Sequence, residues 1–139
     1  MIGADDSRAL DWLSRKRGKG GVIAAGALGP LVPTLGDRQV WNGHWNWSPH
    51  AAERRTAARA ALVGGTPHPG ILLGMSPARF ASATGARFAL LGCGASSPPA
   101  VDRLATPRSS IHRFGCATVI ELAPARQGDL AAVARRYGS

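Results

Sequence analysis

Short apolar runs alternate along the chain with stretches in which apolar residues recur every three or four positions. The apolar runs predict buried strands at residues 22–25, 39–41, 87–91, 110–113 and 118–122. The helical spacing predicts a short turn at residues 30–35 and helices at residues 5–17, 49–63, 77–85, 98–105 and 129–137. The last two strands flank Phe114 and Gly115, which indicates a hairpin.

Local signals mark where several helices begin. Asp5 or Asp6 is expected to cap the first helix through its side chain. The dipeptides Ser48-Pro49 and Ser76-Pro77 each place a hydroxyl cap before a proline in the first turn. These two dipeptides therefore predict where the second and third long helices begin.

Strands that alternate with helices predict an α/β fold. We expect a small, mainly parallel sheet with helices on both faces and a C-terminal antiparallel hairpin. In such sheets, ligands bind at the carboxyl ends of the strands. Residues 41–49, called the Trp segment below, and residues 92–96 both leave predicted strands at that edge.

The length of 139 residues predicts a single domain, residues 1–139, with one hydrophobic core. No apolar run is long enough to span a bilayer, and residues 1–17 lack the apolar centre of a signal peptide. We expect a soluble piece without its own targeting signal, which is compatible with excision from a larger protein.

The net charge of +9 raises the question of nucleic-acid binding. The basic residues are dispersed, and the Trp segment contains no arginine. Nucleic-acid-binding proteins more often carry a basic stripe with interleaved aromatic residues. The pattern favours a solvated surface, or one that meets anionic lipid headgroups, over a nucleic-acid interface.

The Trp segment holds three of the four tryptophans of the chain, beside one histidine and two asparagines. Three tryptophans within seven positions cannot all enter one core, so at least one ring is expected near the surface. Aromatic faces beside amide and imidazole groups suit a sugar or a partner surface. Asn42, His44, Trp45 and Trp47 are the candidate ligand-binding residues. The alternative is that two tryptophans belong to the core and one is exposed by chance.

Residues 92–97, Gly-Cys-Gly-Ala-Ser-Ser, follow a strand as a dinucleotide-binding fingerprint would. Ser97 stands where the third glycine is required, and Pro98 and Pro99 interrupt the helix amides that would face a pyrophosphate. A tight turn at a strand end is the favoured interpretation, and no cofactor is predicted.

No catalytic residue is predicted for this chain. His44 has no carboxylate near it in the sequence to orient it, and the chain contains no Gly-x-Ser-x-Gly motif. The eight acidic residues form no pair suited to acid–base work. The four histidines and two cysteines are too scattered for a zinc site, so no metal is predicted either.

Six segments follow one another in the order of a known family: residues 20–24, 29–33, 40–49, 76–79, 85–91 and 113–122. This series resembles the soluble C-terminal region of polytopic membrane glycosyltransferases of the GT-C type from actinobacteria and their relatives, which themselves resemble dolichyl-phosphate-mannose-dependent mannosyltransferases. The likeness covers about residues 8–122, and its most specific segments are the Trp segment and Arg113-Phe114-Gly115-Cys116-Ala117.

The resemblance implies a non-catalytic extracytoplasmic domain. Enzymes of this family take a sugar from a polyprenyl-phosphate carrier, and their catalytic acidic residues lie in loops between transmembrane helices that this chain does not match. The implied partners are the transmembrane portion of the same polypeptide, acceptor glycan and anionic lipid headgroups. Two alternatives stay open: a free-standing α/β nucleotide-binding protein or enzyme, and a basic nucleic-acid-binding module.

The predicted topology brings the two cysteines together. Cys93 follows the carboxyl end of the strand at 87–91, and a right-handed crossover makes the strand at 110–113 parallel to it. The hairpin turn then places Cys116 at the same edge, within reach of a disulfide. An extracytoplasmic location would keep such a bond oxidised. The alternative is a pair of buried thiols.

Overall fold

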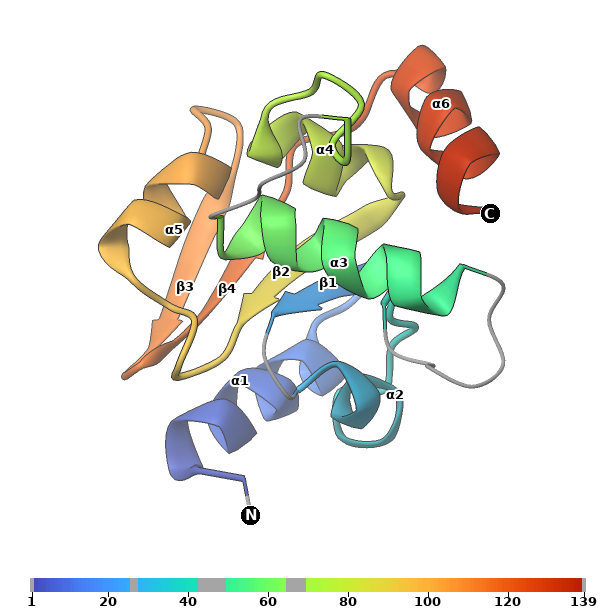
Figure 1. Cartoon of the computed structure of the whole chain (residues 1–139). Helices are drawn as coiled ribbons and strands as arrows, with labels where there is room; N and C mark the ends of the chain where they lie inside the picture. The colour runs from blue at the N-terminus through green and yellow to red at the C-terminus, as the bar shows by residue number, and fades with distance from the viewer. Residues whose placement is uncertain (1, 26–27, 43–49, 65–69, 139) are drawn as a thin grey trace.

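A four-stranded sheet forms the centre of the molecule (Figure 1). The computed structural model describes residues 2–25, 28–42, 50–64 and 70–138. The strands are β1 (Gly21–Ala25), β2 (Ala86–Leu91), β3 (Ser110–Phe114) and β4 (Ala117–Glu121). The helices are α1 (Ala4–Arg15), the 3-10 helix η1 (Gly29–Leu31), α2 (Val32–Leu35), α3 (Ala51–Leu62), α4 (Pro77–Ala83), α5 (Pro98–Leu104) and α6 (Gln127–Tyr137).

The strand order is β1-β2-β4-β3. β1 and β2 are parallel, whereas β4 is antiparallel to both of its neighbours. Three strands, β1, β2 and β3, therefore point the same way, and only β4 runs against them. The prediction of an α/β fold with a C-terminal antiparallel hairpin is confirmed, and the sheet is mixed because β4 inserts between β2 and β3.

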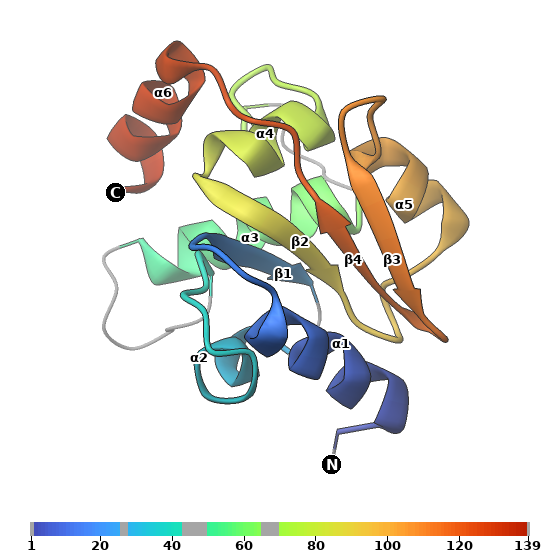
Figure 2. The same ribbon diagram turned by 180° about the vertical axis from the view of Figure 1, so that it is seen from behind.

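Helices cover both faces of the sheet, as predicted. α1 and α2 lie on one face (Figure 2), and α3, α4 and α5 lie on the other (Figure 1). Alternate residues of each strand face opposite sides, because side chains alternate across a strand. In β1, Val22 and Ala24 pack in the cluster that includes α1, and Ile23 and Ala25 pack in the cluster that includes α3 and α5.

A third apolar cluster joins α6 to α3 and α4. Its centre is a set of edge-to-face contacts among Trp41, Phe80 and Tyr137, with ring centroids 5.6–5.9 Å apart. Edge-to-face packing is a favourable aromatic geometry. Trp41, the first tryptophan of the Trp segment, is therefore a half-buried residue that packs against the cluster holding the C-terminal helix.

Serine caps begin two helices. The Ser76 hydroxyl accepts a hydrogen bond from the Arg79 N–H, 3.2 Å away, at the predicted start of α4. The Ser97 hydroxyl accepts one from the Ala100 N–H at 3.3 Å and begins α5. α3 begins at Ala51 after His50, and the predicted cap at Ser48 lies outside the described residues.

The predicted aspartate cap of α1 is wrong. Gly3 precedes the helix, and no side chain caps it. Asp5 and Asp6 lie within the first turn, where a carboxylate still favours the helix dipole. Their oxygens instead accept hydrogen bonds from the distant N–H groups of Cys116 and Cys93. The predicted strand at residues 39–41 is also much reduced: it makes a single parallel bridge, Val22 to Val40.

None of the helices in the described part of the chain is long and apolar enough to cross a bilayer.

Candidate functional site

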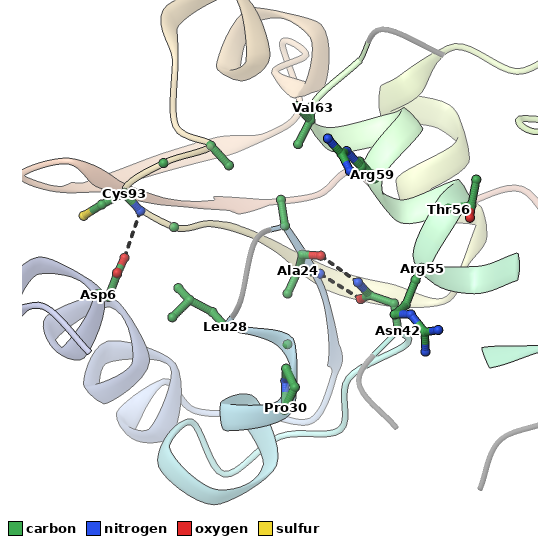
Figure 3. Close-up of a pocket in the computed structure, with 15 residues that line it drawn as sticks. Asp6, Ala24, Leu28, Pro30, Asn42, Arg55, Thr56, Arg59, Val63 and Cys93 are labelled. Atoms are coloured by element: carbon green, nitrogen blue, oxygen red, sulfur yellow. Dashed lines mark hydrogen bonds between the residues drawn. The ribbon is translucent and has the colours of Figure 1, made fainter. Parts of the chain in front are cut away.

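A cleft of about 1090 Å³ lies at the carboxyl ends of β1 and β2 (Figure 3). Apolar groups at the end of β1 and in the turn after it form one part of its lining, including Ala25, Leu28 and Pro30. α3 contributes a second part, and the turn after β2 at Gly92–Ala95 contributes a third. The cleft thus occupies the edge of the sheet where the topology predicts a ligand site.

The α3 side of the cleft carries two positive charges. Arg55 and Arg59 stand one helical turn apart and both line the cleft, as does Val63 one turn further on. Both arginines are exposed. Within the described ranges, neither side chain makes a hydrogen bond or an ion pair with the protein. Their guanidinium groups are therefore available to an external anion.

Asp6 lines the opposite side, and a backbone hydrogen bond holds its carboxylate in place. Its carboxylate oxygen Oδ1 accepts a hydrogen bond from the Cys93 N–H at 3.0 Å, as Figure 3 shows. Asp5, next to it on α1, accepts one from the Cys116 N–H at 3.1 Å. This backbone hydrogen bond and the Arg8 side chain lower the pKa of Asp5. The two carboxylates thus attach α1 to the turns that carry the cysteines.

Cys93 and Cys116 are joined by a disulfide, with their Cα atoms 4.7 Å apart. The bond connects the end of β2 to the start of β4, as the topology argument anticipates. Asp5 and the two sulfurs lie within 4.8 Å of one another, which resembles a group of metal ligands. Because the sulfurs are bonded to each other, this group offers a metal only the Asp5 carboxylate.

The turn after β2 uses most of its own amides. The N–H groups of Ala95 and Ser96 donate to the Gly92 carbonyl, and the Ser97 N–H donates to the Ala95 carbonyl. The Cys93 N–H is bound to Asp6. Dinucleotide-binding turns need free amides that point at the pyrophosphate. The geometry matches the tight turn favoured from the sequence.

Asn42 is the candidate sugar-binding residue that the structure describes. It lines the cleft, and its carboxamide is paired with the backbone of β1. Its Oδ1 accepts from the Ala24 N–H at 3.1 Å, and its Nδ2 donates to the Ala24 carbonyl at 2.7 Å. Within the part of the chain that the structure describes, the second N–H of the amide has no partner and is left for a ligand. The other three candidates, His44, Trp45 and Trp47, lie outside the described residues.

The acidic side chains are mostly tied into ion pairs. Asp129 is buried and receives two hydrogen bonds from Arg79, of 2.7 and 2.8 Å, which lower the pKa of Asp129. Glu53 binds Arg136 and His50, and both lower its pKa. Carboxylates held in this way stay ionised and are poor general acids.

Glu121 lies at the centre of a small charged cluster on the α1 face of the sheet. Burial raises the pKa of Glu121, but hydrogen bonding to His112 and the charge of Lys16 outweigh burial, and the net shift is downward. The His112 ring also stacks on Trp12, with centroids 4.4 Å apart. Trp12 therefore has a structural role, because its ring packs against His112 beside this charged cluster.

Two arginines that the sequence does not distinguish from others have structural roles. The Arg38 guanidinium donates to the carbonyls of Leu13, Lys16, Gly18 and Gly20. The Arg54 guanidinium donates to the carbonyls of Tyr137 and Trp41 and lies over the Trp41 ring. Both therefore connect segments that are distant in sequence.

No known protein family, curated protein or solved structure matches the chain.

The sequence pattern alone does not mark Arg55 and Arg59 as site residues. Their spacing of four residues within a predicted helix was the available signal, because it places both on one helical face. What the sequence lacks is the direction of that face, which depends on how α3 packs on the sheet.

Proposed function

We propose that this chain is a non-catalytic extracytoplasmic domain of an integral-membrane glycosyltransferase that uses a polyprenyl-phosphate sugar donor. The sequence resemblance to GT-C enzymes is the starting point. The structural observation that carries the proposal is the Cys93–Cys116 disulfide, because such bonds persist in oxidising compartments and are rare in the cytosol.

Within this proposal, the carboxyl edge of the sheet contributes to acceptor-glycan binding. The Trp segment continues directly from Asn42, which lines the cleft at that edge. Aromatic rings bind sugars by stacking, so His44, Trp45 and Trp47 are the proposed contact residues. The transmembrane portion of the same polypeptide would be the constant partner of the domain, and anionic lipid headgroups would lie close to its basic surface.

The proposal assigns no chemistry to the domain itself. Six of the eight acidic side chains, Asp5, Asp6, Asp11, Glu53, Glu121 and Asp129, already bind a cation or a backbone N–H. The reaction would belong to the membrane-embedded part.

Chemical-shift mapping of the isotope-labelled domain with mannose oligosaccharides tests the glycan role. Weak binding is expected, since a stacked ring contributes on the order of 1 kcal/mol. Shifts should gather at residues 41–49 and weaken in Trp45→Ala and Trp47→Ala. Leu35→Ala, which removes an exposed apolar side chain elsewhere, is the control. Shifts confined to residues far from 41–49 would remove the Trp segment from the proposal.

Two alternative functions have their own signatures. A nucleotide-binding protein would show a higher unfolding temperature with nucleotides. A nucleic-acid-binding module would bind oligonucleotides with an affinity that falls steeply with salt. Either result would favour that alternative over the membrane-domain proposal.

A further inference from the structure

We infer that the cleft at the carboxyl ends of β1 and β2 is a binding site for a phosphate ester, with Arg55 and Arg59 as the groups that hold the phosphoryl oxygens. This inference does not rest on the proposed function, because it uses only the cleft and its lining.

The first step is the position of the two arginines. They lie on successive turns of α3, about 6 Å apart along the helix axis at 1.5 Å per residue. Figure 3 shows both side chains on the part of α3 that lines the cleft. Long, mobile arginine side chains at this spacing can reach the same anion from two sides.

Among the described residues, the Arg55 and Arg59 guanidinium groups make no contact that would give them a structural role. Arg38 and Arg54 spend their donors on backbone carbonyls, and Arg79 spends its donors on Asp129. In the described part of the chain, Arg55 and Arg59 have neither a carbonyl nor a carboxylate partner. Two uncompensated positive charges beside one cleft form a local positive potential, which the net charge of +9 strengthens.

Two guanidinium groups suit a phosphate ester better than a carboxylate. A carboxylate has two oxygens, which a single guanidinium can engage in a bidentate pair. A phosphate ester has more free oxygens and suits two guanidinium groups at once. Asp6, on the opposite side, repels an anion, so the phosphoryl group is expected beside α3.

The cleft has room, and an apolar lining, for more of the ligand than its phosphoryl group. Leu28, Pro30 and Ala25 give the cleft an apolar lining at the end of β1 and in the segment that follows it. The volume of about 1090 Å³ is far larger than a phosphate ion needs, and matches the upper end of small-molecule sites, roughly 300–1000 Å³. We therefore expect an organic group on the phosphate that covers the apolar lining.

The test is a titration of the isotope-labelled domain, followed by amide shifts, with hexyl phosphate as the probe and the neutral hexyl glucoside beside it. Hexyl phosphate should shift residues 24–25, 28–30, 55–63 and 92–95. R55Q/R59Q should weaken its binding about tenfold or more, since hydrogen bonds between charged groups are lost. Arg135→Gln removes one positive charge at an exposed position of α6, outside the cleft, and should bind as the wild type does.

Two further probes test the ester and its source. Inorganic phosphate that binds as well as hexyl phosphate would overturn the ester, because the apolar lining would then contribute nothing to binding. Co-sedimentation with phosphatidylglycerol vesicles but not phosphatidylcholine vesicles, lost in R55Q/R59Q, would point to a lipid headgroup. The inference is overturned if hexyl phosphate leaves the cleft residues unshifted, if hexyl glucoside shifts them equally, or if R55Q/R59Q binds as Arg135→Gln does. Equal unfolding temperatures of both variants would exclude misfolding as the cause of lost binding.

Discussion

The side-chain amide of Asn42 pairs with both backbone groups of Ala24. Its oxygen accepts the Ala24 N–H, and its nitrogen donates to the Ala24 carbonyl. Two residues earlier in β1, the Val22 N–H donates to the Gln39 carbonyl, and the Val22 carbonyl accepts from the Trp41 N–H. The Asn42 side chain therefore continues the parallel hydrogen-bond ladder that Val40 begins, by pairing with the next edge-facing residue of β1. The edge of β1 is covered although residues 39–42 form only an isolated bridge and not a full strand.

Asn42→Ala should lower the free energy of unfolding by about 1–2 kcal/mol, because two hydrogen bonds are lost and the Ala24 groups are left unpaired. Asn42→Asp keeps the acceptor and loses the donor, and it should also be destabilising because a carboxylate then faces the Ala24 carbonyl. Urea unfolding of each variant measures the change. Gln39→Ala is the matched control, since Gln39 is exposed and offers its backbone carbonyl to this edge. A loss in Gln39→Ala as large as that in Asn42→Ala would contradict the role of the amide.

Arg38→Lys should destabilise the protein although the charge is kept. The guanidinium contacts the Leu13 carbonyl in the last turn of α1 and three carbonyls in the segment that joins α1 to β1, at 2.5–3.2 Å. It also lies 4.7 Å from the Phe88 ring centroid. A lysine cannot reproduce this fork of donors, and the expected loss is about 2 kcal/mol for two or more hydrogen bonds. Denaturant unfolding checks the value against Arg135→Lys, at an exposed site on α6. An unchanged midpoint for Arg38→Lys would show that the carbonyl contacts contribute nothing net.

The Arg79–Asp129 pair predicts part of the acid sensitivity. The folded protein holds the pKa of Asp129 below its unfolded value of 3.8, chiefly through the hydrogen bonds from Arg79. The stabilisation is therefore present above about pH 4 and is lost as the pH falls through the folded pKa. Asp129→Asn should show a shallower loss of stability below pH 4, measured by urea unfolding at several pH values. Asp102→Asn, exposed on α5, should keep the wild-type slope. Identical slopes for Asp129→Asn and the wild type would refute the linkage.

The positions of most helices and strands could be predicted because their signals are local. Ser76 caps α4, and the predicted β3–β4 hairpin forms, although its turn lies at Gly115 and Cys116 while Phe114 is still paired in β3. The aspartates of α1 show the limit of such signals. Asp5 and Asp6 are residues of a type that commonly caps helices. Their hydrogen-bond partners are 111 and 87 residues away in the sequence, and no local pattern reveals contacts over such distances.

The arginines of α3 show the same limit for the site. Arg54 and Arg55 are adjacent and chemically identical, and their roles differ because they point to different faces of one helix. Arg54 binds the Trp41 and Tyr137 carbonyls, whereas Arg55 lines the cleft. The predicted order of strands and helices is enough to predict that a ligand site would lie at the carboxyl edge of the sheet. Which arginines would reach it depends on the packing of α3, which the sequence pattern leaves open.

The isolated chain is expected neither to transfer nor to hydrolyse sugar. Six of its eight carboxylates are already engaged, and the arginines that bind Asp129 and Glu53 keep these two ionised and orient them away from a substrate role. The measurement is turnover of a polyprenyl-phosphate mannose by the purified chain, with heat-denatured protein as the blank. Turnover that a single substitution within the chain abolishes would contradict this expectation.

The last prediction concerns the Cys93–Cys116 disulfide. Protein purified without reductant, unfolded and treated with an alkylating agent should gain no alkyl groups, and a reduced sample should gain two.

The bond spans 23 positions of sequence, and chain-entropy estimates for a loop of this size give about 3 kcal/mol of stabilisation. C93S/C116S should lose about that amount in urea unfolding, because the unfolded chain regains its freedom. The Asp6 and Asp5 carboxylates bind the backbone N–H groups of the two residues, so these contacts survive the substitution and should keep the hairpin in place. Reductant should lower the stability of the wild type to that of C93S/C116S and leave the variant unchanged. Two freely alkylated cysteines in the unreduced protein would refute the bond, and would remove the main structural support for an extracytoplasmic domain.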